Sequence, residues 1–124
     1  MLNLTTVMIG SEDPKQLGEF YEKVLGEPGW QDSGYVGWMA GTGMLMIGPH
    51  SEVKGSNGEP GRIIMNFESP DFHDEYERIK GLGATVEHEP YQPGGDAAGE
   101  MWLATFADPD GNFFQIATPM PSPE

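Results

Sequence analysis

The chain repeats one order of local signals in its two halves, and this repetition is the feature that most constrains its fold. In the first half, a strand-like run over residues 2–10 precedes a helix start in which Asp13 can cap the exposed amides and Pro14 takes the first helical position. In the second half, Ser69 and Pro70 provide the same pair of signals after another strand-like run. We therefore predict two copies of one βαβββ unit in tandem.

The segments between these signals agree with that prediction. Each predicted helix carries an apolar stripe at helical spacing: Leu17, Phe20, Tyr21, Val24 and Leu25 in the first, and Phe72, Tyr76 and Ile79 in the second. Glycines are expected to end the helices, at Gly26 and Gly83. The remaining strand-like runs cover 33–41, 43–50, 61–68, 84–90, 100–108 and 112–119.

The predicted fold class is α+β, with two βαβββ modules that form curled mixed sheets around a cleft. We expect a single domain over residues 1–124. Its first module covers about 1–52, its polar, glycine-rich linker about 53–60 and its second module about 61–118, with a short tail over 119–124. The segment 91–99 is expected to be a flexible loop. A cleft between two modules is where a ligand is expected to bind.

Charge and composition exclude several partners. Twenty acidic residues against six basic ones give a formal net charge of −14, which argues against nucleic acid and anionic membranes. Such a charge would attract a cationic ligand, and the alternative interpretation, which we prefer, is that it keeps the protein soluble. The chain has no cysteine, which rules out disulfides and thiolate ligands. No apolar run approaches the length of a membrane span, and no secretory signal is recognisable, so a cytoplasmic location is expected.

Three segments resemble a known family. Asp13 followed by the run 17–26, the run 75–84, and the run FADPDGNFFQI over 106–116 resemble the vicinal oxygen chelate superfamily, which contains glyoxalases, extradiol dioxygenases, fosfomycin-modifying enzymes and bleomycin-resistance proteins. The resemblance spans nearly the whole chain and implies the paired-module fold. It does not identify a reaction, because this fold carries many activities.

The resemblance also implies where a metal would be held. In the metal-using members the ligands are histidines and glutamates at positions that fall here on Thr6, on one of residues 63–65, on Met44, Met46 or Ile47, and on Gln115. None of these side chains is a normal ligand for a divalent transition metal. We therefore expect a metal-free member with no cofactor, in which Gln115 acts as a hydrogen-bonding amide in place of a metal-binding glutamate.

Strand alternation suggests which side chains line the cleft. The candidate ligand-binding residues are Thr6, Met8, Trp38, Met46, Met65, Trp102 and Gln115, with Met44 beside them and Trp30, Tyr35 and Tyr91 at the rim. Aromatic rings give flat apolar walls and methionines adapt to irregular ligands. Alternatively, Trp38 and Trp102 pack in the core, and Gln115 is a structural amide whose hydrogen bonds are satisfied by Thr6 or by a backbone group. The acidic turn DPDG over 108–111 is expected to be structural, with Gly111 at positive φ.

Three functions remain open from the sequence. The preferred one is a metal-free protein that binds, and thereby sequesters, a planar aromatic or cationic small molecule such as an antibiotic, in the manner of the bleomycin-resistance branch, with homodimers as the resemblance implies. The alternative is a metal-dependent glyoxalase-like lyase, isomerase or dioxygenase with displaced ligands, for which His50 and Glu100 are the candidates and the catalytic residues are otherwise unknown. The third is a regulatory or interaction module with an empty cleft.

Overall fold

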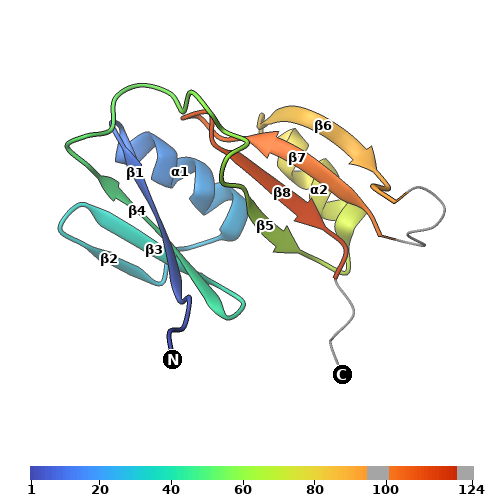
Figure 1. Ribbon diagram of the computed structural model, residues 1–124, viewed down its shortest axis with the longest axis horizontal. Helices are drawn as coiled ribbons and strands as arrows, with labels where there is room; N and C mark the ends of the chain where they lie inside the picture. The colour runs from blue at the N-terminus through green and yellow to red at the C-terminus, as the bar shows by residue number, and fades with distance from the viewer. Residues whose placement is uncertain (95–100, 120–124) are drawn as a thin grey trace. The chain divides into compact units, whose positions relative to one another are not determined.

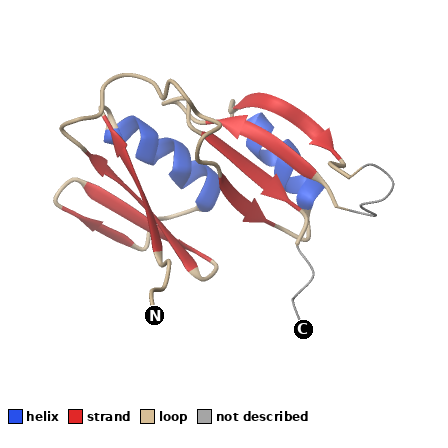
Figure 2. Cartoon of the chain, in the orientation of Figure 1, coloured by secondary structure: helices blue, strands red, loops and turns tan. Residues whose placement is uncertain are grey.

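Two compact units make up the chain in the computed structural model, which describes residues 1–94 and 101–119. The first unit, Met1–Ser56, contains β1 (Thr6–Ser11), α1 (Pro14–Leu25), β2 (Trp30–Asp32), β3 (Tyr35–Ala40) and β4 (Gly43–Pro49). The second, Asn57–Glu124, contains β5 (Met65–Glu68), α2 (Phe72–Gly81), β6 (Thr85–Tyr91), β7 (Leu103–Ala107) and β8 (Phe113–Ala117). The predicted α+β fold with tandem βαβββ modules is confirmed (Figures 1 and 2). The unit boundary falls inside the segment predicted as the linker, 53–60.

Each unit contains its own four-stranded mixed sheet, and the two sheets have the same topology. The strand orders are β1-β4-β3-β2 and β5-β8-β7-β6, so each strand of the second sheet occupies the place of its counterpart in the first. In each sheet the pair that includes the first strand is parallel, β1 with β4 and β5 with β8, and the other pairs are antiparallel. The sequence did not single out β2 as a strand, because its three residues are too few to show alternation.

Helix α1 begins and ends as its sequence predicts. Asp13 is the N-cap and its carboxylate accepts a hydrogen bond from the amide of Gln16 at 3.1 Å, with Pro14 in the first helical position. Gly26 ends the helix with φ 96°, a left-handed conformation that suits glycine. Leu17 and Tyr21 are fully buried, and this stripe packs the helix against its sheet.

Helix α2 begins later than the sequence predicts. Ser69 and Pro70 precede the helix, and Asp71 is its N-cap residue. The hydroxyl of Ser69 instead accepts a hydrogen bond from the amide of Asp71 at 3.0 Å, in a turn that leads into the helix. The predicted strand over 61–68 is also shorter, since β5 begins at Met65. Neither helix in the described part of the chain is long and apolar enough to cross a membrane.

Each unit has its own core on the helix side of its sheet. In the first unit, Trp38, Leu45 and Ile47 are buried. In the second, the ring of Phe106 lies 5.5 Å from Tyr76 of α2 and 5.4 Å from Phe114 of β8, measured between centroids. Aromatic pairs of this kind each add about 0.5–1.5 kcal/mol beyond their buried area. Both sheets are therefore covered on one face by a helix.

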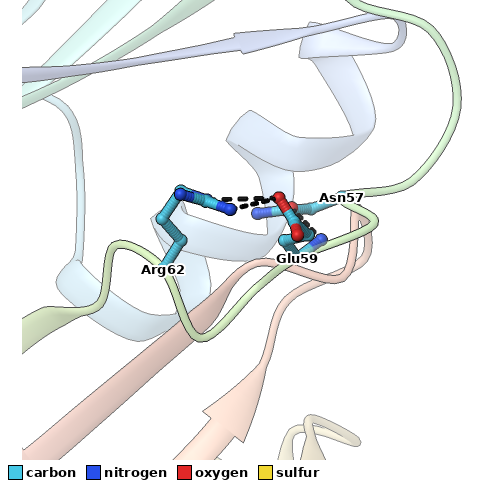
Figure 3. Close-up of polar contacts among 3 residues, drawn as sticks. All are labelled: Asn57, Glu59 and Arg62. Atoms are coloured by element: carbon cyan, nitrogen blue, oxygen red, sulfur yellow. Dashed lines mark hydrogen bonds and ion pairs between the residues drawn. The ribbon is translucent and has the colours of Figure 1, made fainter.

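The segment between the units is hydrogen-bonded at both of its ends. The amide of Gly55 donates to the carboxylate of Glu12 at 3.2 Å, within the first unit. The amide of Asn57 donates to the carbonyl of Asp110 at 2.8 Å, within the second. A local cluster follows in which the amide of Glu59 donates to the Asn57 side chain and Arg62 pairs with Glu59 at 2.7 Å (Figure 3). One residue, Ser56, lies between the amide bonded within the first unit and the amide bonded within the second.

Candidate functional site

Each sheet has a face turned away from its helix, which we call the open face. Residues paired across neighbouring strands point to the same side of a sheet, and alternate residues along one strand point to opposite sides. Buried Trp38 and its partner Leu45 mark the helix side of the first sheet. Buried Phe106 and its partner Phe114 mark the helix side of the second. The remaining alternate positions define the open faces.

The open face of the first unit is apolar. Its central row joins all four strands in register, as Met8 on β1, Met46 on β4, Gly37 on β3 and Trp30 on β2. Met8 is 49% exposed and Trp30 is 41% exposed. The Trp30 ring lies over Gly37, because a Cβ atom built there would come 3.5 Å from Trp30 Cε3. The row therefore offers thioether and indole surface for contact.

A second row extends this surface along the strands. Thr6 pairs with Met44, and Met44 pairs with Met39, which is 61% exposed. Of the residues expected at a ligand site, Thr6, Met8 and Met46 therefore share one face with Met44. Sequence reasoning did not include Met39. Its place in the sequence, just before the glycine turn over 41–43 and therefore opposite Met44 in a hairpin, could have identified it.

The other end of this face is closed by a tyrosine. A Cβ atom built on Gly48 would lie 2.0 Å from Tyr35 Cδ1, so the Tyr35 ring lies directly over the glycine. The imidazole of His50 lies beside Gly10, and its Nδ1 accepts a hydrogen bond from the amide of Glu52 at 3.2 Å. Tyr35 thus lies at the edge of the open face of its own unit, as a rim residue would.

The open face of the second unit carries a polar row. One residue from each strand takes part: Asn66 on β5 pairs with Gln115 on β8, Gln115 with Thr105 on β7, and Thr105 with His88 on β6. Two irregularities in β6, on either side of His88, adjust the register so that His88 meets Thr105. We call these four residues the polar row.

Gln115 is held by its neighbour in this row. Its Nε2 donates a hydrogen bond to the hydroxyl of Thr105 at 3.1 Å. Within its own unit, the partner of this amide nitrogen is a side-chain hydroxyl and not the backbone group that the sequence-based alternative also allowed. Among the described residues, the Gln115 carbonyl oxygen accepts no hydrogen bond. The amide is anchored on its nitrogen side and open on its oxygen side.

Three residues expected in the cleft lie on the helix sides instead. Trp38 is 2% exposed and its Nε1 donates to the carbonyl of Gly26 at 2.9 Å. Trp102 stacks on Phe72 of α2 with centroids 6.5 Å apart. Met65 pairs with buried Phe114. The open-face residue of β5 is Asn66, one position along, because a shift of one residue moves a side chain to the other face.

Of two further candidates, Tyr91 lies on a described strand and Glu100 does not belong to the described residues. Tyr91 ends β6, and its ring lies 4.0 Å from that of His88 between centroids. Glu100, the carboxylate considered for a displaced metal site, lies outside the described residues. The turn at Asp108 is structural, as predicted: its carboxylate accepts hydrogen bonds from the amides of Asp110 and Asn112, and Gly111 has φ 81°.

A cavity of about 690 Å³ lies apart from these rows, in the first unit. One stripe of α1 and the β2–β3 hairpin line it, with Lys15, Glu19, Glu22 and Asp32 as its charged residues. Gly18 allows the helix to approach β3 closely here, since a Cβ atom at this position would come 3.3 Å from Val36 Cγ1. The cavity is bordered by the helix and is distinct from the apolar row.

The sequence matches a family model described as a glyoxalase-like domain over residues 6–117. The chain belongs to the glyoxalase-like domain family. This places it in the vicinal oxygen chelate superfamily, and the resemblance inferred from the sequence is confirmed. A search of curated proteins found no significant relative.

Solved structures support the fold of this glyoxalase-like protein. A glyoxalase/bleomycin resistance protein/dioxygenase family enzyme from Burkholderia phytofirmans PsJN has a TM-score of 0.74 and 20% identity, covering 96% of this chain and 100% of that one. A lactoylglutathione lyase from Agrobacterium tumefaciens has a TM-score of 0.70 and 21% identity, covering 94% and 92%. The fosfomycin resistance protein FosX from Mesorhizobium loti has a TM-score of 0.67 and 19% identity, covering 97% and 92%. At these identities the likeness shows the fold alone.

The residues present do not fit the metal site that the superfamily resemblance implies. The open-face side chains at the corresponding positions are the hydroxyl of Thr6, the thioethers of Met44 and Met46, and the amide of Gln115, and the open-face residue next to positions 63–65 is Asn66. All are neutral, and none matches the imidazole and carboxylate ligands that hold divalent transition metals. In the described part of the chain, no three His, Asp or Glu side chains lie together in a way that could hold a metal ion.

Proposed function

We propose that this glyoxalase-like protein binds a small organic molecule on the open faces of its sheets, without a metal ion. The observation that carries the proposal is the polar row, in which Gln115 stands where the resemblance implies a metal-binding glutamate and lies beside the neutral hydrogen-bonding groups of Asn66 and Thr105. Amides and hydroxyls both donate and accept, so they suit carbonyl, amide or amine groups of a ligand.

The first unit supports the same proposal with different chemistry. Met8, Met39 and Trp30 are largely exposed although they are apolar. Exposed apolar side chains that share one face support an interaction site, and methionine with tryptophan suits flat, irregular ligands. A planar aromatic or cationic compound, such as an antibiotic, is the ligand class that these faces and the charge of −14 favour together.

Two of the similar structures are described by their resistance families, bleomycin and fosfomycin. We extend from them to this chain only the idea of a small-molecule ligand, and we propose homodimers and a cytoplasmic location as secondary expectations. A lyase, isomerase or dioxygenase activity with displaced metal ligands is the competing function.

The deciding experiment measures metal content per chain by inductively coupled plasma mass spectrometry. The protein is expressed in medium supplemented with iron, zinc, nickel and manganese, and purified without a histidine tag or chelator. We expect far less than one metal ion per chain, because neutral donors hold these ions weakly. About one bound ion per chain would overturn the metal-free proposal and favour the enzyme, with His50, His73, His88 and Glu100 as the residues to substitute next.

A further inference from the structure

The polar row has a direction that the residue types alone do not show. Gln115 donates through Nε2 to Thr105 at 3.1 Å, and Asn66 donates through Nδ2 to the carbonyl of Ile64 at 3.2 Å. Among the described residues, neither amide oxygen accepts a hydrogen bond in return. Each amide oxygen has two lone pairs, and each nitrogen has already used one of its two protons. Both amides therefore present more acceptors than donors.

His88 adds a third acceptor to the row. Its Nδ1 lies 2.8 Å from the carbonyl oxygen of Glu89. A carbonyl oxygen can only accept, so the proton of this contact belongs to Nδ1, and the Nε2 atom of the neutral ring carries a lone pair. The ring is further held against Tyr91, 4.0 Å away between centroids. The hydrogen bond thus selects the tautomer in which the free nitrogen accepts.

The spacing of these acceptors follows from the sheet. Asn66 and Gln115 are direct partners, and His88 is two strands beyond Gln115 with Thr105 between them. Neighbouring strands lie about 4.8 Å apart, so the backbone positions of Gln115 and His88 are separated by about 10 Å. Two donors close together therefore match Asn66 and Gln115, and a longer ligand with a further donor at roughly the width of two strands also reaches His88.

We propose that the polar row selects organic cations that carry several N–H donors, of the amidinium or guanidinium class, and that Thr105 is the positioning residue that sets this preference. The inference rests on the proposed function, since it specifies the ligand chemistry of the same open face. Thr105 is 7% exposed, so its role is to hold the Gln115 amide with its oxygen free. The net charge of −14 favours the accumulation of such cations around the chain.

Two probe cations separate hydrogen-bond donation from charge. Benzamidinium and phenyltrimethylammonium share a phenyl ring and a single positive charge, but only benzamidinium has N–H groups. Each is titrated into the full ¹⁵N-labelled chain and followed by NMR. We expect benzamidinium to bind about tenfold more tightly, which is a common penalty for losing one good hydrogen-bonding match. The largest shifts are expected at Asn66, Gln115 and His88.

Two variants at Thr105 test the positioning role. Thr105→Val removes the hydroxyl and frees the Gln115 amide to turn, so the tenfold preference should fall to about threefold or less. Thr105→Ser keeps the hydroxyl and should keep the preference. Without any ligand, one side-chain amide proton of Gln115 should exchange slowly with water in the wild type and in Thr105→Ser, and faster in Thr105→Val.

A variant at an exposed position keeps the test independent of folding. Asn66→Leu removes one acceptor at an exposed site and should weaken benzamidinium binding several-fold while leaving phenyltrimethylammonium unchanged. Equal affinities of the two cations, with shifts on the open face, would overturn the inference and leave the proposed function standing. No shift on the open faces with either cation would overturn both. Rapid exchange of both Gln115 amide protons in the wild type would overturn the role of Thr105.

Discussion

Asp108 is a buried carboxylate that holds the turn between β7 and β8. It is 5% exposed, and its Oδ1 accepts hydrogen bonds from the amides of Asp110 at 2.9 Å and Asn112 at 3.0 Å. The side-chain amide of Asn112 donates to the same carboxylate, at 3.0 Å to Oδ2. One residue thus satisfies the backbone of a turn that precedes the strand carrying Gln115.

Replacing this carboxylate should destabilise the protein. We expect Asp108→Ala to lower the free energy of unfolding by about 2–3 kcal/mol, because several buried N–H groups lose their acceptor. Urea denaturation followed by circular dichroism measures the change. Asp108→Asn, which keeps one acceptor oxygen, is the matched control and should lose less. Equal losses for the two variants would mean that charge, and not hydrogen bonding, dominates.

A substitution at Trp38 tests whether this side chain lies on the helix side of its sheet, away from the ligand. Trp38→Phe removes the Nε1 donor from the Gly26 carbonyl and leaves a gap in the core, so the free energy of unfolding should fall by about 1–3 kcal/mol. Binding of an aromatic cation to the open face should stay within twofold of wild type. A large loss of binding in a folded variant would contradict the placement of Trp38 away from the ligand.

The face of a single side chain was the hardest feature to predict from the sequence. Trp38, Trp102 and Met65 have the composition expected of a ligand site, yet they lie on the helix sides. Alternation along a strand gives two sets of residues but does not say which set faces the helix, and a one-residue shift exchanges them. Gln115 was singled out by the sequence because it is the polar residue between Phe114 and Ile116, both of which are buried, and its ligand-binding role stays a prediction.

At the scale of elements, strands β3 and β4 pack closely where the Tyr35 ring lies over Gly48. A methyl group at this position would overlap the Tyr35 ring on β3, since a Cβ atom built there lies 2.0 Å from Tyr35 Cδ1. We expect Gly48→Ala to lower the free energy of unfolding by about 1–2 kcal/mol as the ring is displaced. Thermal or urea unfolding measures the loss.

The same substitution should behave differently without the ring. In a Tyr35→Ala background, Gly48→Ala should be neutral or slightly stabilising, because alanine is better than glycine inside a strand. The double-mutant cycle then isolates the contact between Tyr35 and Gly48. Additive effects of the two substitutions would show that the ring does not lie over the glycine.

Helix α2 carries an ion pair with a defined dependence on pH. The hydrogen bond from Arg78, and to a smaller degree its charge, lower the pKa of Glu75, while partial burial opposes this effect. A lowered folded-state pKa means that the stabilisation is present above the unfolded pKa and is lost as pH falls through the folded one. We expect Glu75→Gln to cost about 0.3–0.5 kcal/mol near pH 7, since the pair is partly exposed, and progressively less as the pH falls below the ordinary pKa of glutamate. Glu77→Gln on the same helix is the control, and an equal pH dependence in both variants would contradict the role of Arg78.

The elements themselves were largely predictable, and their ends were not. Asp13 and Pro14 predicted the start of α1 because capping and proline placement have a direct local cause. The same reasoning placed the start of α2 too early, since Ser69 makes its hydrogen bond in the preceding turn. A serine followed by a proline suits both a cap and a turn, so local sequence does not separate the two.

At the level of the whole molecule, charge should control how strongly a cation binds. The net charge of −14 attracts cations over long distances, and salt screens this attraction within about 10 Å at 0.1 M. We expect benzamidinium affinity to fall several-fold between about 20 mM and about 200 mM sodium chloride, while its ratio to phenyltrimethylammonium stays constant. Isothermal titration at several salt concentrations measures both quantities. Salt-independent affinity would contradict the contribution of overall charge.

The duplicated plan was predictable from the sequence, because two periodic helices and their flanking strands recur in one order. The chemistry of the open faces was only partly predictable, since it depends on register across four strands. The polar row joins residues that lie far apart in the chain, such as Asn66 and Gln115, and no local pattern connects them. Pairing is a property of the sheet and cannot be seen in one strand.

The two sheets share one strand order, yet the open face of one carries a row of methionine and tryptophan and the open face of the other carries a row of amides, a hydroxyl and an imidazole. Most of the buried apolar side chains lie on the helix sides, whereas Met8 and Asn66 on the open faces are exposed. The fold can therefore tolerate wide sequence drift at positions such as Met8, Met46, Asn66 and Gln115. Descendants of such a scaffold can acquire new ligands by exchanging a handful of outward residues, without having to evolve a new core.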